Sequence, residues 1–66
     1  MEGQYRNEIY PGLAVGIILK KDQHSGTITY GVVKTLLTSA AFHSRGIKVQ
    51  LTDGRVGRVI AINSEE

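Results

Sequence analysis

The chain has 66 residues, with no cysteine, two histidines and a formal net charge of +2. This length allows one domain with one compact core, and the composition excludes both a disulfide framework and a cysteine-based zinc site. Apolar runs such as residues 14–19 are too short to cross a bilayer and residues 1–7 lack a signal-peptide pattern, so we expect a cytoplasmic protein without a membrane segment.

The charges are distributed unevenly along the sequence. Four of the six acidic residues lie within residues 2–8 and 65–66. Residues 10–63 contain seven basic residues against two acidic ones, a net charge of +5. Such an excess is typical of a protein that binds a polyanion, and an ordinary solvated surface is the alternative.

The first ordered segment is expected after Pro11 and Gly12, a dipeptide typical of turns. We interpret residues 1–9 as a flexible N-terminal arm, frayed or weakly docked through Tyr5 and Ile9, and residues 10–63 as a single barrel domain. Alternating apolar residues predict a half-buried strand over 13–19. The polar residues 20–26 end in glycine and predict a turn.

A second strand is predicted over residues 27–37, which are rich in β-branched side chains. Gly31 interrupts the pattern and indicates a bulge or a close approach of backbones. Tyr30 alternates with apolar neighbours, which predicts a position in the core or at the barrel rim. Residues 38–45 are irregular, and form a loop or one helical turn in which Phe42 is either a core plug or an exposed anchor.

The clearest element is a hairpin near the C-terminal end of the sequence. Residues 47–52 and 55–62 both have strand patterns, and Asp53 and Gly54 between them are typical of a two-residue type I′ turn. Residues 64–66 are expected to form a disordered acidic tail.

These elements predict an all-β fold, a small SH3-like barrel of four to five strands. The fifth strand would come from the region of Tyr10 or Phe42, and an OB-like barrel is the alternative that the short chain disfavours. In the predicted hairpin, Lys48 lies roughly opposite Ile60 or its neighbour, and Arg58 lies near Gln50. Lys48, Gln50 and Arg58 would then share one solvent face, which is either a binding surface or a charged face that discourages aggregation.

Two stretches, residues 10–20 and 43–59, resemble the YwbE-like family of small uncharacterised bacterial and archaeal proteins. The motif Gly-Ile-Lys-Val at 46–49, followed by Asp-Gly-x-Val-Gly-Arg-Val at 53–59, carries most of this resemblance, which extends over roughly residues 10–62. The sequence departs from the family at Tyr30, where a basic residue is more usual, and at Ser44, where a Pro-His pairing is more usual. Pro11-Gly12-x-x-Val15 is also similar to KOW-type SH3-like barrels, many of which bind RNA or ribosomal proteins.

No catalytic constellation is recognisable in this sequence, so we expect no enzymatic activity, no cofactor and no metal. Asp22 and Asp53 both fall in predicted turns, where aspartate is favoured for local hydrogen bonds. His24 is expected to be an exposed turn residue. His43 lies beside Ser44 and Arg45, and all three residue types contact phosphate in other proteins.

The function that fits best is a small binding module for RNA or a ribonucleoprotein, without a small-molecule substrate. Four aromatic residues are too few for a base-stacking platform, so we expect backbone-dominated, salt-sensitive binding. The alternative is a protein-interaction or assembly module that uses a strand edge or the loop 39–42. The residues expected to contact nucleic acid are Arg45, Lys48, Arg55, Arg58, Lys34, Lys20, Lys21 and His43.

Overall fold

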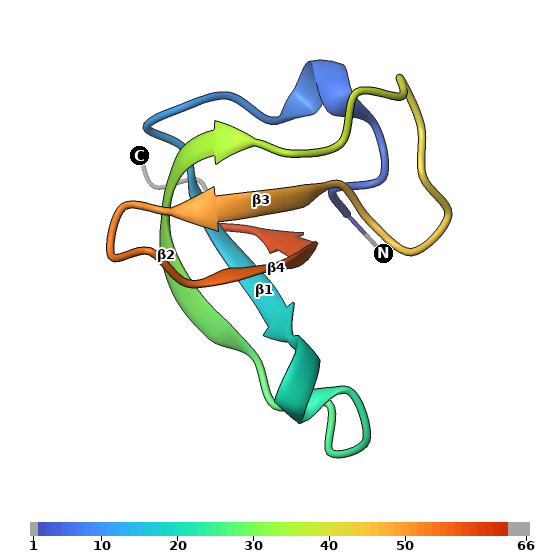
Figure 1. The fold of residues 1–66 in the computed structure, drawn as a ribbon. Helices are drawn as coiled ribbons and strands as arrows, with labels where there is room; N and C mark the ends of the chain where they lie inside the picture. The colour runs from blue at the N-terminus through green and yellow to red at the C-terminus, as the bar shows by residue number, and fades with distance from the viewer. Residues whose placement is uncertain (1, 64–66) are drawn as a thin grey trace.

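The protein is described by a computed structural model that covers residues 2–63, so the predicted acidic tail lies outside the described residues. Four strands form its framework: β1 (Ala14–Leu19), β2 (Thr29–Leu36), β3 (Lys48–Leu51) and β4 (Val56–Ile62). Two short 3-10 turns, η1 (Arg6–Glu8) and η2 (Lys20–Asp22), precede β1 and follow it. The strands pair antiparallel in the order β1, β2, β3, β4, and β4 returns to β1, which closes the barrel (Figure 1). The predicted all-β, SH3-like barrel is therefore confirmed, with four strands.

The core fills the inside of this barrel with aliphatic side chains. Because side chains alternate across a strand, every second residue of each strand points inward. Burying one such side chain contributes about 1.5–3 kcal/mol, and loop residues close the open ends of the barrel. The buried apolar residues are Ile9, Leu13, Val15, Ile17, Val33, Ile47, Val49, Leu51 and Val59.

Glycines permit two close contacts between neighbouring strands. A Cβ added at Gly31 would lie 2.6 Å from Cδ1 of Leu51, and one added at Gly57 would lie 2.5 Å from the backbone oxygen of Ile18. The interruption at Gly31 thus makes room for the Leu51 side chain of β3, and not for a neighbouring backbone. The register irregularity of this pair lies a few residues later, between Val33 and Thr35.

The hairpin between β3 and β4 differs from its sequence prediction. Gly54 has a φ of 95°, but no non-glycine residue in the described chain has a positive φ, so Asp53 does not adopt the conformation of a type I′ turn. The amide of Leu51 donates to the oxygen of Arg55 at 2.7 Å, and the amide of Gly54 donates to the oxygen of Leu51 at 2.9 Å. The loop therefore has three residues, and the two-residue type I′ prediction was wrong. The Asp53 carboxylate favours this form because it accepts the amide of Arg55 at 3.0 Å.

Residues 2–9 are docked against the barrel and do not form a frayed arm. The amide of Ile47 donates to the oxygen of Gly3 at 2.8 Å, and the amide of His43 donates to the oxygen of Gln4 at 2.9 Å. Ile9 is only 4% exposed and belongs to the core. Backbone hydrogen bonds and one buried side chain together offset the entropy lost when this segment is ordered.

The structure also shows where the aromatic residues Phe42 and Tyr30 lie. The Phe42 region forms an isolated bridge to Tyr5 rather than a fifth strand, and the two ring centroids lie 4.9 Å apart. Phe42 is 45% exposed, so it is an exposed aromatic residue and not a core plug. Tyr30 is 58% exposed on the outer face of β2, so it is not a core residue. Its ring covers Gly16 of β1, which has no side chain to exclude it.

Candidate functional site

The outer face of β4 brings its basic residue Arg58 beside Lys48 of the neighbouring strand β3. Arg58 of β4 is paired with Lys48 of β3 on one side and with Ile18 of β1 on the other. Gln50 is paired with Val56. The expected pairing of Lys48 with Ile60 was wrong because the loop has three residues, which moves the register. The shared solvent face holds, since paired residues project to the same side of a sheet.

Two adjoining clefts lie on this face of the sheet, and together we call them the β4 groove. The first has a volume of about 310 Å³ and is lined by Ile18, Gln23, Gly26, Arg45, Arg58 and Ile60. The second has a volume of about 400 Å³ and is lined by Ile18, Lys20, Gln23, Lys48, Val56, Gly57 and Arg58. Ile18, Gln23 and Arg58 belong to both clefts, which makes the groove continuous.

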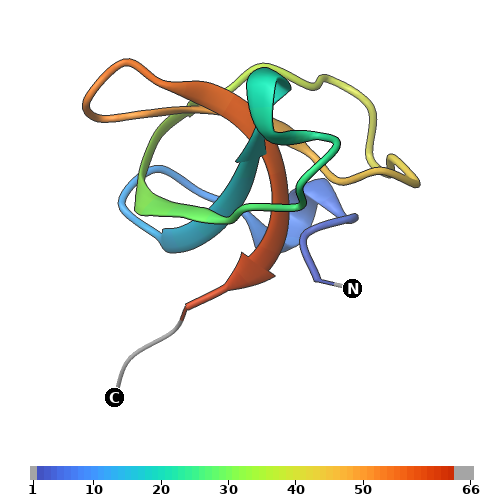
Figure 2. The same cartoon turned by 90° about the horizontal axis from the view of Figure 1, so that it is seen from below.

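One wall of the β4 groove is the loop that joins β1 to β2. The 3-10 turn η2 bends the chain directly after β1, and the amide of Gly26 donates to the oxygen of Asp22 at 2.9 Å. Gly26 has a φ of 74°, a conformation that favours glycine. The loop consequently lies beside β4 and brings Gln23 to the groove (Figure 2).

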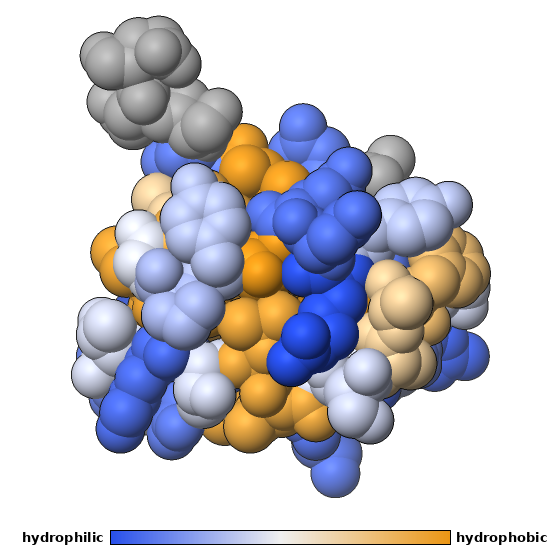
Figure 3. Space-filling view, turned by 90° about the horizontal axis from the view of Figure 1, so that it is seen from above, coloured by the Kyte–Doolittle hydropathy of each residue, from blue (hydrophilic) through white to orange (hydrophobic). Residues whose placement is uncertain are grey.

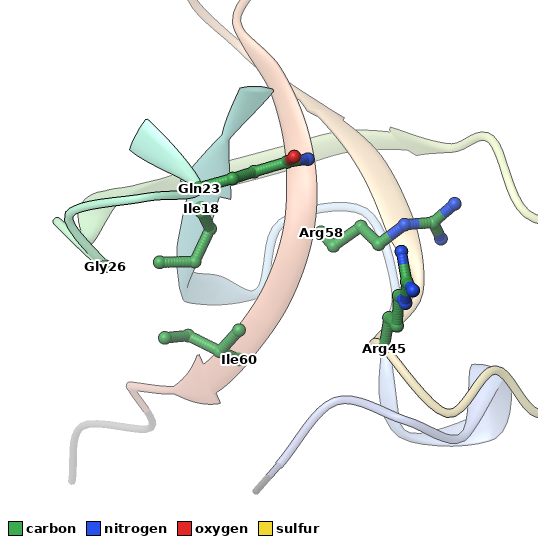
Figure 4. Close-up of a pocket in the computed structure, with 6 residues that line it drawn as sticks. All are labelled: Ile18, Gln23, Gly26, Arg45, Arg58 and Ile60. Atoms are coloured by element: carbon green, nitrogen blue, oxygen red, sulfur yellow. The ribbon is translucent and has the colours of Figure 1, made fainter. Parts of the chain in front are cut away.

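Two arginines form the opposite side of the first cleft (Figure 4). The Nη1 atom of Arg58 donates to the oxygen of Gly46 at 3.0 Å, which leaves other donors of its guanidinium for a ligand. Arg45 lies in the turn immediately before Gly46. Its amide donates to Nδ1 of His43 at 3.1 Å, and the amide of Gly46 donates to the oxygen of His43 at 3.0 Å. His43 therefore holds the turn that carries Arg45, and it does not itself line the groove.

The N-terminal segment supports the same turn from the other side. The side-chain amide of Gln4 donates to the oxygen of Ser44 at 2.8 Å, next to Arg45 in the chain. The position of Arg45 thus depends on a segment distant in sequence. No local pattern near residue 45 could have predicted this support.

The side chains of the groove give it a positive field. Lys20, Arg45, Lys48 and Arg58 line it, and no carboxylate is among its lining residues. Lys48 and Arg58 are directly paired across two strands, so their like charges repel until an anion lies between them. An anion that bridges such cations releases this repulsion along with bound counterions.

The other predicted contact residues lie elsewhere. Arg55 is at the hairpin tip, where its Nη2 lies 2.5 Å from Oδ2 of Asp53. That hydrogen-bonded ion pair raises the pKa of Arg55 and lowers the pKa of Asp53, so the charge of Arg55 is matched locally. Lys34 is exposed on β2, across the barrel from β4, and Lys21 is exposed on η2 without lining the groove.

The sequence interpretation missed the apolar part of the groove. Ile18 and Ile60 are half-buried on the outer faces of β1 and β4, and both line the first cleft. Their out-facing parity was a usable signal, because alternation places them opposite the core residues Ile17 and Val59. Gln23 had no such signal, since its place depends on how the loop 20–26 folds over β4.

Comparison with known proteins extends over nearly the whole chain. Residues 2–62 match the model of a family described as "Uncharacterized conserved protein (DUF2196)". A protein of Bacillus subtilis (strain 168), named "Uncharacterized protein YwbE", is 57% identical over 58 residues, which cover 88% of this chain and 89% of that protein. No solved structure matches the chain. Within residues 2–63, no helix is long and apolar enough to cross a membrane.

Proposed function

Because this chain belongs to the YwbE-like family of uncharacterised conserved proteins, its function has to be inferred from its own surface, and we propose that it binds RNA through the β4 groove. The ligand is RNA alone or within a ribonucleoprotein, and binding is dominated by contacts to the phosphate backbone. We place the protein in the cytoplasm, where such ligands are abundant. The proposal includes no catalytic step.

The observation that carries this proposal is the composition of the groove lining. Four cations from three separate parts of the chain converge there without an acidic neighbour in the lining. Arginine donates in a planar fork that fits phosphate, and lysine acts as a point charge beside it. Each phosphate neutralised by such a side chain releases counterions, which favours binding at low salt.

The lining also explains why we propose binding rather than catalysis. Beyond the four cations it contributes one side-chain amide, aliphatic groups and glycine backbone. The lining includes no carboxylate, imidazole, thiol or hydroxyl, so its two lysine amines have no acid–base partner there. The groove can hold and orient an anionic polymer without changing it.

A pair of charge reversals tests the proposal. Lys48→Glu alters the groove, and Lys34→Glu makes the same charge change on β2, across the barrel. With a fluorescein-labelled single-stranded RNA at low salt, we expect K48E to bind about tenfold or more weakly than the wild type and K34E to bind nearly as tightly.

Fluorescence polarisation gives both affinities, and a urea denaturation curve for each variant shows that both proteins are folded. The proposal fails if the wild type does not bind RNA at low salt. It also fails if K34E and K48E weaken binding equally, because the effect would then follow net charge and not the groove.

A second candidate function is a protein-interaction module. Barrel closure gives every strand of the described residues two neighbours, which reduces the strand edge that a partner could use. The loop form is favoured by exposed apolar groups, since Leu37 is 49% exposed and Phe42 packs on Tyr5 at the surface. A band of apolar side chains runs between polar ones on the face that carries η1 (Figure 3). A protein partner that remains bound after nuclease treatment and in high salt would favour this function over RNA binding.

A further inference from the structure

The β4 groove has an apolar floor at one end, beside its cations. Ile18 and Ile60 lie on one side of β4, and Arg45 and Arg58 lie on the other (Figure 4). The second cleft continues past Arg58 to Lys20 and Lys48. A ligand that follows the groove therefore meets aliphatic side chains first, then the two arginines, and then the two lysines.

From this arrangement we infer that the groove takes single-stranded RNA, with one base seated on the floor formed by Ile18 and Ile60 and with the phosphates next to that base on the basic side chains. The inference rests on the proposed RNA-binding function and adds the form of the RNA. It also assigns a role to residues that phosphate binding alone does not use.

The apolar floor distinguishes single-stranded RNA from a duplex. In an A-form duplex the base faces are stacked inside, and the protein meets mainly phosphates, ribose hydroxyls and base edges. A duplex would leave Ile18 and Ile60 without a suitable partner. An unstacked base has an apolar face of its own, so contact with this floor removes apolar surface of both molecules from water.

The size of the first cleft supports the same conclusion. Its volume of about 310 Å³ lies at the lower end of the ~300–1,000 Å³ range of small-molecule sites. That space suits a single nucleoside and is too small for a helix. Because the lining residues include no aromatic ring, the base would rest on aliphatic groups, which tolerate any base identity.

Gln23 supplies a polar contact beside the floor. Its side-chain amide extends across β4 toward Arg58 (Figure 4), and within residues 2–63 it has no protein hydrogen-bond partner. An amide offers two donors and an acceptor, which matches the exposed edge of a flipped base. Arg58 keeps donors free after its bond to Gly46, so phosphate and base contacts can form together.

Three labelled RNA probes with the same number of phosphates test the inference at one fixed, low salt concentration. They are a single-stranded oligonucleotide, the same strand with abasic central positions, and a hairpin duplex. We expect the single strand to bind about tenfold more tightly than the abasic strand, because the base buries apolar surface against the floor. The duplex should bind no better than the abasic strand.

Two variants link this preference to the floor. Ile60→Ser should weaken binding of the single strand and leave binding of the abasic strand unchanged. Ile28→Ser, a matched change at a residue that is 37% exposed outside the groove, should alter neither. Gln23 is an exposed loop residue, so Gln23→Ala tests the inference without disturbing the fold. This substitution should weaken single-strand binding about two- to tenfold.

The outcomes separate the two proposals. Equal binding of all three probes, or an equal effect of I60S on intact and abasic strands, overturns the base-seating inference and leaves RNA binding in place. Absence of binding by every probe overturns the proposed function itself.

Discussion

Replacing Gly57 with alanine should destabilise the barrel at the seam between β1 and β4. An added Cβ would lie 2.5 Å from the backbone oxygen of Ile18 and 3.0 Å from Cδ1 of Ile17. The nearest atom belongs to the backbone, so no rotation of a side chain can relieve the contact. The two strands must instead separate, and Gly57 is also paired with Leu19 of β1 and Val49 of β3.

The size of the destabilisation follows from two opposing contributions, a steric cost in the folded state and an entropy change in the unfolded state. Forcing an extra carbon into a packed interior usually costs about 1–3 kcal/mol. The lower entropy of alanine in the unfolded chain offsets about 0.4–1 kcal/mol of this. We therefore expect Gly57→Ala to lower the free energy of unfolding by about 1–2 kcal/mol. A domain of 66 residues has about 3–10 kcal/mol in total, so the loss is measurable.

Gly16→Ala is the matched control on the neighbouring strand. Its added Cβ would lie 2.8 Å from Cγ2 of Ile28 and 2.9 Å from Cε1 of Tyr30. Both side chains are exposed at the surface and can rotate away. Urea denaturation should give a midpoint for G57A clearly below that of G16A, at an unchanged slope. Equal midpoints would refute the reasoning, because the backbone contact at Ile18 would then have no energetic consequence.

Three further predictions concern charge and the N-terminal segment. With four cations in the groove, a plot of the logarithm of the RNA affinity against the logarithm of the salt concentration should have a slope of about −2.8. Lys48→Ala should reduce the size of this slope by about 0.7. An unchanged slope in polarisation titrations would exclude Lys48 from the contact. The hydrogen bonds from Arg55 lower the pKa of Asp53, so its contribution to stability is complete above about pH 4 and is lost as the pH falls through the lower folded pKa. Asp53→Asn should therefore flatten the dependence of the urea midpoint on pH below about pH 4, and an equally steep profile would contradict this. Deleting residues 2–7 should lower both the melting temperature and the RNA affinity, because these residues support the turn that contains Arg45. A lower melting temperature with unchanged affinity would show that this turn keeps its conformation without the N-terminal segment.

The dependence of Arg45 on the N-terminal segment shows how the fold and the site are connected. Gln4 binds Ser44 beside Arg45, and Gly3 binds Ile47 at the entry to β3. A segment expected to be flexible thus positions one side of the groove. Contacts of this kind join residues about 40 positions apart, and local patterns contain no information about them.

The sequence by itself determined the strand content, the position of the hairpin, the family and the excess of positive charge. These properties follow from local chemistry, since alternation sets which side chain faces the core and glycine marks where a turn or a close contact is needed. The type of hairpin loop was beyond such reasoning. Asp53 and Gly54 fit either loop length, and the hydrogen bond from the Arg55 amide to Asp53 favours the longer one.

The hairpin pattern placed Lys48 and Arg58 on one solvent face, but only the tertiary structure decided which other basic residues join them. A two-residue loop would pair Lys48 near Ile60, whereas the observed three-residue loop pairs Lys48 with Arg58. The observed register brings both cations to the groove. Closure of the barrel places Lys34 on the far side, and the hairpin tip pairs Arg55 with Asp53. Charge along a sequence is additive, but a binding surface depends on which strands become neighbours when the barrel closes.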